Sequence, residues 1–489
     1  MNQDNGGIIG KINTPTTTVA SGVWTLQDQF EAQSSSTWPL AFPQTTIANS
    51  CRFNNDSSDY LIRTPSGASN RDAWTLSLWI KRCNLGTYQS IYGIYADANN
   101  QENFGFDDSD RFFWQLYQSG SAVGQLTSNR VFRDTSAWYH IVAVYDSENS
   151  TAGNRMRLYI NSVEETSFAT DTNPSSGLDS LWNSTTAHSI GRINTTNYID
   201  MYLAEFIHVD GQALTPTSFG ATNPVTNIWE PIAYTGTYGT NGFKLNFADS
   251  SNLGDDTSGN GNDFTVNNLT SVDQSTDTCS NNFATMNSLY KLSNVTFSEG
   301  NLQHTNAGNW QPGLSTIGVS SGKWYFESKF TAVTGGANNA FIGISLDTEA
   351  DGLTLVGNSA NSYGYENTGQ KKNNSSSASY GDSWTVGDIV SCYVDLDNGA
   401  IYFGKNGTVQ ASGDPTSGST KTNAAYTFTT GGTYLLGVSD YYGTQQVNYG
   451  SPPFSISSGN ADANGFGNFE YAVPSGYFAL NTKNLSEFG

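Results

Sequence analysis

The chain has 489 residues, a formal net charge of −22 and only 13% charged side chains. So strong a negative charge repels phosphate, which argues against nucleic acid and against an anionic membrane as partners. The length exceeds what one hydrophobic core supports and predicts two or three domains. Ser, Thr, Asn and Gly supply most of the polar character, a composition typical of all-β proteins on virions or outside cells.

Residues 1–45 form a distinct arm, in which Ser21 can cap a short amphipathic helix that ends at Trp38-Pro39. The apolar face of this helix comprises Val23, Leu26 and Phe30. Because the arm is too small to bury that face in a core of its own, it suits docking onto another surface. A flexible leader, or a strap on the next domain, is the alternative. Neither a signal-peptide pattern nor an apolar run of membrane-spanning length is visible.

Residues 46–222 carry strand patterns throughout. Trp74, Leu76, Leu78 and Ile80 alternate with more polar neighbours and therefore face one way. Residues 138–145 are apolar on both faces, which predicts an inner strand of a sandwich. Alternation returns in residues 155–161 and 202–211.

Residues 223–290 are expected to be a connector. Residues 241–247 make a plausible strand, and a turn-rich loop follows at residues 255–264. The sequence leaves open whether this segment completes the first sandwich or bridges to the second.

The clearest hairpin pattern lies at residues 387–407, within a second domain at residues 291–489. Val390, Cys392, Val394 and Leu396 show the period of a half-buried strand. The pairs Asn398-Gly399 and Asn406-Gly407 accept the positive φ that tight turns require. The predicted fold class is therefore all-β, with two antiparallel jelly-roll or β-sandwich domains and a short N-terminal arm.

The first domain resembles laminin-G-like, concanavalin-type jelly rolls. The resemblance rests on residues 73–80, 138–145, 158–161, 190–192, 203–206 and 211–214. The D-x-S-G-N-G-N pattern from Asp256 also resembles the entry loop of such domains, although here it follows the domain.

The second domain resembles SPRY domains, which are antiparallel sandwiches that bind other molecules and catalyse nothing. The matching segments are residues 322–327, 341–345, 363–365, 387–407, 447–450, 452–454 and 474–480.

The arm is similar to an element of marine bacteriophage virion proteins. Residues 21–26, Glu31-Ala32-Gln33 and Trp38-Pro39 carry this likeness. It implies docking to the particle, and the candidate docking residues are Val23, Trp24, Leu26, Phe30 and Trp38.

No catalytic pattern stands out, so the chain is expected not to be an enzyme. A retaining glycosidase needs two carboxylates close together on one strand face, whereas the neighbour of Glu205 in the right direction is Ile207. Glu205 is therefore expected to be a solvated carboxylate. The histidines show no Ser/His/Asp order, and His140 and His208 are expected to be packed residues.

No cofactor is expected, except that calcium has two weak candidate sites. One is the acidic loop Asp107, Asp108 and Asp110, because hard cations want several oxygens from one turn and laminin-G-like domains often hold calcium at a rim. Asp255, Asp256 and Asp263 form the other candidate. A solvated turn is the alternative for both loops.

Aromatic side chains on sandwich loops are the best candidates for ligand binding, because exposed rings stack on sugars or anchor proteins. The candidates are Tyr363, Tyr365, Trp384, Tyr441 and Tyr442. Tyr363 and Tyr365 could instead be core residues, whereas Tyr441 and Tyr442 precede Gly443 in a predicted turn.

Four cysteines occur without a C-x-x-C pair, so a zinc site is not expected. Cys392 is expected to be a small buried apolar residue. Cys51 and Cys83 could pair, and reduced thiols are the alternative.

The resulting hypothesis is a non-enzymatic phage appendage, such as a fibre, a spike or a capsid-attached protein. Its arm would dock to other virion proteins of the capsid or tail, and its sandwiches would contact a glycan or protein of the host surface. Nucleic acid and membrane insertion are not expected, and a homo-oligomer is an option. The alternatives are a structural decoration or assembly protein of the virion and a surface-polysaccharide depolymerase.

Overall fold

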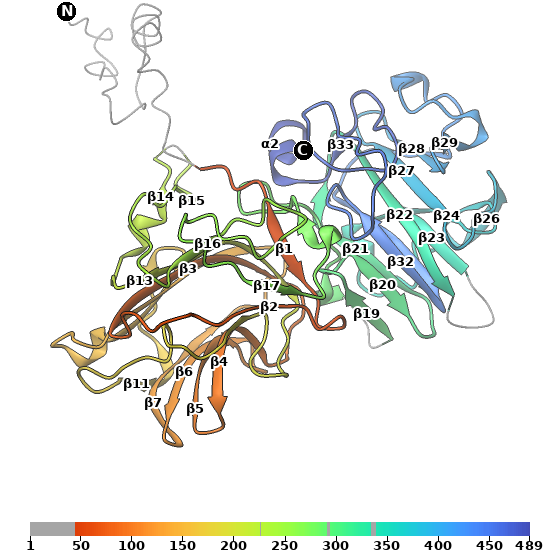
Figure 1. Ribbon diagram of the computed structural model, residues 1–489. Helices are drawn as coiled ribbons and strands as arrows, with labels where there is room; N and C mark the ends of the chain where they lie inside the picture. The colour runs from red at the N-terminus through yellow and green to blue at the C-terminus, as the bar shows by residue number, and fades with distance from the viewer. Residues whose placement is uncertain (1–44, 225, 291–293, 334–338) are drawn as a thin grey trace, which may run out of the picture.

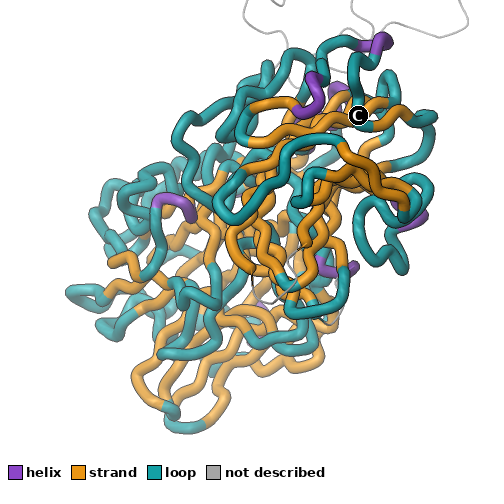
Figure 2. Tube along the Cα trace, turned by 90° about the vertical axis from the view of Figure 1, so that its right-hand side faces the viewer, coloured by secondary structure: helices purple, strands orange, loops and turns teal. Residues whose placement is uncertain are grey.

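The computed structural model describes residues 45–224, 226–290, 294–333 and 339–489 and has two β-sandwiches beside each other (Figure 1). Strands and loops form nearly the whole trace in Figure 2. The α-helix α2 (Thr482–Phe488) lies at the C-terminus. The 3₁₀ turns are η1 (Ala152–Asn154), η2 (Pro216–Ser218), η3 (Ser271–Asp273), η4 (Ser288–Tyr290), η5 (Asp347–Glu349), η6 (Gln410–Ser412) and η7 (Gly418–Thr420). No helix in the described ranges is long and apolar enough to cross a membrane. The all-β prediction is confirmed.

The first sandwich is built from two eight-stranded antiparallel sheets. One runs in the order β10 (Val163–Glu164), β9 (Met156–Ile160), β8 (Trp138–Asp146), β3 (Ala73–Arg82), β13 (Met201–Asp210), β1 (Ser50–Phe53) and β18 (Gln274–Ser275), with β16 (Phe243–Leu245) also paired to β13. The other runs in the order β11 (Phe168–Thr172), β7 (Ser121–Val131), β6 (Arg111–Gln118), β5 (Asn100–Phe106), β4 (Gln89–Asp97), β12 (His188–Ile190), β2 (Tyr60–Arg63) and β17 (Thr265–Asn267).

The strand patterns of the first domain are confirmed. Trp74, Leu76, Leu78 and Ile80 all enter the same core between the sheets. Strand β8 is an inner strand with both faces buried. Its outer face is covered by a side layer around the small sheet of β14 (Gly220–Thr222) and β15 (Trp229–Pro231).

Much of the expected connector belongs to the first sandwich. Strand β16 pairs with β13, β17 pairs with β2, and β18 pairs with β1. Residues 243–275 thus add strands to both sheets, although they follow the rest of the domain in the chain. The loop with the D-x-S-G-N-G-N pattern lies between β16 and β17.

The second sandwich has a nine-stranded and a six-stranded sheet. The first runs in the order β19 (Val295–Ser298), β20 (Gln303–Asn306), β32 (Gly443–Asn448), β22 (Lys323–Val333), β27 (Ile389–Asp395), β28 (Ala400–Lys405) and β29 (Thr408–Val409), with β30 (Tyr426–Thr427) on β28 and β33 (Phe478–Ala479) on β22. The second runs in the order β21 (Gln311–Val319), β31 (Tyr434–Tyr441), β23 (Asn339–Leu346), β24 (Ser362–Glu366), β25 (Gln370–Asn373) and β26 (Ser376–Ser379).

Strand β27 is buried on both faces, so the expectation of a half-buried strand is wrong. Val390, Cys392 and Val394 do enter the core between the sheets. The opposite face is covered by a C-terminal layer that includes Phe469 and Tyr477, which lie far away in the sequence. The predicted turns do form, with positive φ at Gly399 and at both Asn406 and Gly407.

All four cysteines are free, so Cys51 and Cys83 do not pair, and Cys392 is buried as expected. The two sandwiches have distinct cores, yet buried polar contacts join them. The Lys81 ammonium donates to the Asp277 carboxylate at 2.7 Å and to the Phe283 carbonyl at 2.9 Å. Tyr202 donates its hydroxyl to the Gly300 carbonyl.

Candidate functional site

Three of the five candidate ligand-binding aromatics lie in the core of the second sandwich. Tyr363, Tyr365 and Trp384 are 6%, 0% and 3% exposed. Tyr363 and Tyr365 are two residues apart on β24, so both rings point to the same, inward face. Tyr365 stacks on Phe403 at 5.5 Å between ring centroids. The alternative that Tyr363 and Tyr365 are core residues is therefore confirmed, and the expectation that Trp384 is presented to a ligand is wrong.

Tyr441 and Tyr442 are partly exposed: Tyr441 ends β31, and Tyr442 is the single residue between β31 and β32. Their ring centroids are 4.8 Å apart in an edge-to-face arrangement. Tyr442 has φ = 56°, which is an unfavourable region for a bulky residue. Since such strain gathers at functional sites, Tyr442 is a candidate for a functional side chain.

Sequence reasoning missed Trp310, which completes this group. Gln311 pairs with Asp440 across β21 and β31, so the preceding Trp310 lies opposite Tyr441. The two rings are 5.4 Å apart. Only the pairing of β21 with β31, which are far apart in the sequence, places Trp310 beside Tyr441. Trp310, Tyr441 and Tyr442 are called the aromatic cluster below.

The aromatic cluster lies on a well-supported sheet. Trp310 also packs edge-to-face on buried Phe341 of β23, at 5.4 Å between centroids. The cluster therefore joins the outer apolar layer of the six-stranded sheet while its rings stay partly exposed. Partly exposed rings on a rigid base can stack on the apolar face of a sugar or anchor a protein loop at small cost in entropy.

One Ser–His contact exists, but its geometry does not suit nucleophilic catalysis. Ser77 Oγ lies 2.9 Å from His140 Nε2, and Trp229 donates its indole N–H to His140 Nδ1 at 3.0 Å. Because Nδ1 accepts, the ring proton resides on Nε2 and is donated to Ser77. His140 in this tautomer cannot accept the serine proton. Burial lowers the pKa of His140 to about 3.

The other histidines are packed as well, which confirms the expectation for His140 and His208. His208 Nε2 contacts the Asn183 amide oxygen at 2.9 Å, and burial lowers its pKa to about 3. His188 is buried with a similarly low pKa. His304 instead contacts the buried Asp440 carboxylate at 2.8 Å.

Glu205 is not a solvated carboxylate. It lies at an irregularity of β13, where its φ is 44°, and it pairs with Lys244 at 3.1 Å. Burial is the largest cause of its raised pKa, and the Lys244 charge opposes that effect. The expectation failed because β16, which carries Lys244, folds back beside β13.

In the first candidate calcium loop, the carboxylates of Asp107 and Asp110 form ion pairs with arginines. Asp107 pairs with Arg111 at 2.7 Å, and Asp110 pairs with Arg82 at 3.1 Å and with Arg133 at 2.9 Å. Asp108 is exposed. Throughout the described ranges there is no group of three or more acidic, His or Cys side chains that could hold a metal ion. Calcium binding at this loop stays a prediction, and it would have to compete with these arginines for the carboxylates of Asp107 and Asp110.

In the second candidate calcium loop, the carboxylates accept hydrogen bonds from nearby backbone N–H groups. Asp256 accepts hydrogen bonds from the backbone of Lys244, Ser258 and Asn262. Asp263 accepts one from the backbone of Asp256. These carboxylates shape the loop. The docking residues Val23, Trp24, Leu26, Phe30 and Trp38 lie outside the described residues.

Two family models match the chain. Residues 55–218 match the concanavalin A-like lectin/glucanases superfamily, in its laminin-G form, and residues 323–428 match the SPRY domain. A short segment is similar to ATP-dependent RNA helicases DDX1: 32% identity over 98 residues for Xenopus laevis, covering 20% of this chain and 12% of the helicase. For Dictyostelium discoideum the identity is 30% over 109 residues, covering 22% and 13%. The chain thus spans about an eighth of the length of these relatives.

Solved structures include similar chains. The SPRY domain of human HERC1 matches 30% of this chain and 87% of its own, with 20% identity and a TM-score of 0.24. A heptameric SAP-like pentraxin from Limulus polyphemus matches 35% of this chain and 80% of its own, with 18% identity and a TM-score of 0.27. From the two family models, the chain combines a laminin-G-like, concanavalin-type domain with a SPRY domain.

Proposed function

We propose that this protein is a non-enzymatic binding protein of a bacteriophage particle that contacts a glycan or protein of the host surface. The observation that carries the proposal is the aromatic cluster, three partly exposed rings on the rigid second sandwich. Its strained Tyr442 keeps a large side chain at a position where glycine would fit with less strain.

The case against an enzyme rests on the chemistry of the described side chains. Ser77 and His140 are in the wrong tautomeric arrangement, and Glu205 is paired with Lys244. Asp273 and Glu299 lie near each other because both contact Arg52, at 3.4 and 3.5 Å. Asp273 also accepts from the Thr270 backbone, and Glu299 accepts from the Asn54 amide. These carboxylates hold the fold together, which weakens the depolymerase alternative.

The virion setting rests on the resemblance of residues 1–45 to phage structural proteins. A decoration or assembly protein would carry the same arm. The two roles differ in whether the protein alone binds host material, and they can be separated by experiment.

The direct test is a glycan array and a host-cell pull-down with the purified protein. The wild type is compared with Tyr441→Ala/Tyr442→Ala and with Tyr290→Ala, a matched control that removes a tyrosine 45% exposed outside the cluster. We expect binding by the wild type and the control and at least a tenfold loss in the double variant.

Immunogold labelling of phage particles tests the setting. Labelled particles together with a protein that binds no host material would favour the decoration role. Soluble sugar released from host envelopes would favour the depolymerase.

A further inference from the structure

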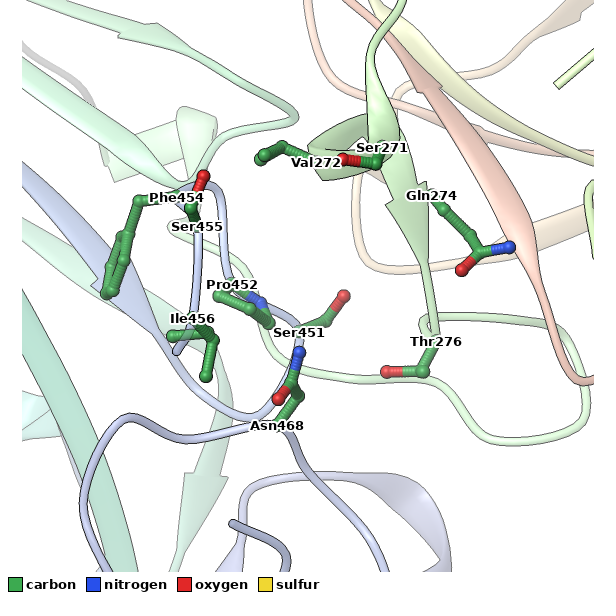
Figure 3. Close-up of a pocket in the computed structure, with 10 residues that line it drawn as sticks. All are labelled: Ser271, Val272, Gln274, Thr276, Ser451, Pro452, Phe454, Ser455, Ile456 and Asn468. Atoms are coloured by element: carbon green, nitrogen blue, oxygen red, sulfur yellow. The ribbon is translucent and has the colours of Figure 1, made fainter. Parts of the chain in front are cut away.

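A pocket of about 230 Å³ lies between the two sandwiches (Figure 3). One wall comes from η3, β18 and the residue after β18 in the first sandwich, and it includes Ser271 and Thr276. The other wall comes from the loop after β32 and includes Pro452 and Phe454. The pocket is smaller than the roughly 300–1,000 Å³ of sites for drug-sized ligands, so it suits one small ring.

A single buried arginine sets the spacing of the two walls. The Arg52 guanidinium, which is 0% exposed, donates to the carbonyl of Val272 at 3.1 Å and to that of Pro452 at 3.3 Å. Ser275 and Ser451 share a hydroxyl–hydroxyl hydrogen bond of 2.7 Å across the same junction. The pocket is therefore preformed by contacts that span both domains, which lowers the entropic cost of binding.

The lining is uncharged and has two kinds of surface. Ser271, Thr276, Ser455 and Asn468 make no side-chain hydrogen bond within the described part of the chain, so their hydroxyl and amide groups remain available to a ligand. Pro452, Phe454, Ile456 and Val272 supply the apolar part. Figure 3 shows residues of both kinds around the same space.

The residues that line the pocket carry no charge. The Arg52 charge is balanced by Asp273 and Glu299, and none of these three residues lines the pocket. Lys329 lies 5.3 Å from the centre of the Phe454 ring but does not line the pocket. A charged ligand would thus lose its hydration without gaining an opposite charge.

We infer that this interdomain pocket binds one neutral pyranose ring. Its hydroxyls would replace water at Ser271, Thr276, Ser455 and Asn468, and its C–H face would lie on the partly exposed side chains of Pro452 and Ile456. The inference rests on the proposed binding function and adds a second contact point, separate from the aromatic cluster.

The test uses the full chain and a panel of methyl glycosides of glucose, galactose, mannose and N-acetylglucosamine, with glucuronic acid as the charged comparison. Binding is detected by saturation-transfer NMR and measured by calorimetry. The pocket is filled by Ser455→Trp, whose matched control is Ala463→Trp at an exposed position outside the pocket. A third variant is Tyr441→Ala/Tyr442→Ala.

We expect at least one neutral glycoside to bind, with a Kd raised tenfold or more by Ser455→Trp and changed less than twofold by the other two variants. Glucuronic acid should bind more weakly. Circular dichroism and thermal unfolding establish that Ser455→Trp is folded, and Thr276→Trp is the second pocket-filling variant if it is not.

Three results would overturn the pocket assignment. These are no glycoside binding at all, binding insensitive to both pocket-filling variants, and binding lost only with the two tyrosines. In each of these cases host-cell binding by the wild type would leave the proposed function standing. If the wild type binds a glycoside in the pocket but does not bind host cells, that result would count against the proposed function alone.

Discussion

The aromatic cluster and the interdomain pocket are built in different ways. The cluster needs only the second sandwich, since Trp310 directly precedes β21 while Tyr441 and the supporting Phe341 lie on β31 and β23 of the same sheet. The pocket needs both sandwiches, because its walls are spaced by Arg52 and by the pair Ser275–Ser451. A disturbance of the first sandwich or of the junction should therefore remove the pocket and spare the cluster.

The largest expected effect comes from Arg52→Ala. It leaves Asp273 and Glu299 without their buried cation and the carbonyls of Val272 and Pro452 without a donor. Breaking a buried ion pair from one side costs about 3–5 kcal/mol. Chemical unfolding measures the loss, and Arg71→Ala, which breaks a partly exposed pair with Asp179, is the control at about 1 kcal/mol or less. Equal losses in the two variants would contradict the role given to Arg52.

Tyr365→Ala sharpens the contrast between buried and exposed aromatics in one domain. Tyr365 is fully buried, so its truncation leaves a cavity and should cost about 3 kcal/mol or more. Tyr441→Ala should cost about 1 kcal/mol, because its ring is partly exposed. Thermal unfolding of the two single variants measures both losses of stability. A larger loss for Tyr441→Ala than for Tyr365→Ala would contradict the burial assigned to these two rings.

Acid should weaken the first sandwich more than the second. Burial lowers the pKa of His140, His188 and His208 to about 3, so only the unfolded chain takes up protons on these residues as the pH falls below about 6.5. Each histidine then costs about 2 kcal/mol at pH 5. Burial raises the pKa of Glu102 to about 7 and that of Asp59 to about 6, which has the opposite sign and offsets part of the loss.

Glu205 adds a further offset, because burial raises its pKa as well, so the expected net loss in the first sandwich between pH 7 and pH 5 is smaller than the sum over the three histidines. In the second sandwich burial raises the pKa of Asp440, so protonation of its carboxylate does not weaken the folded state as the pH falls. Urea unfolding at both pH values, followed by hydrogen exchange of each domain, measures the difference. Constant or rising stability of the first sandwich on acidification would contradict this account.

The sequence predicted those features that depend on neighbouring residues. The alternation in residues 73–80 and the Asn406-Gly407 turn needed no long-range information, and both are present. The second buried face of β27 was missed, because Phe469 and Tyr477 cover it from about 80 residues away. Trp310 and the pocket were missed for the same reason, since each depends on strands or loops brought together only by the fold.

Host-cell binding by Tyr441→Ala/Tyr442→Ala tests the central claim most directly. Aromatic anchors often contribute about 2 kcal/mol or more each, so the double variant should lose at least tenfold in affinity. Its thermal unfolding should remain a single cooperative transition, which shows that the variant is folded. Tyr290→Ala should bind like the wild type. Undiminished binding by the folded double variant would contradict the claim that the aromatic cluster is the contact with the host surface.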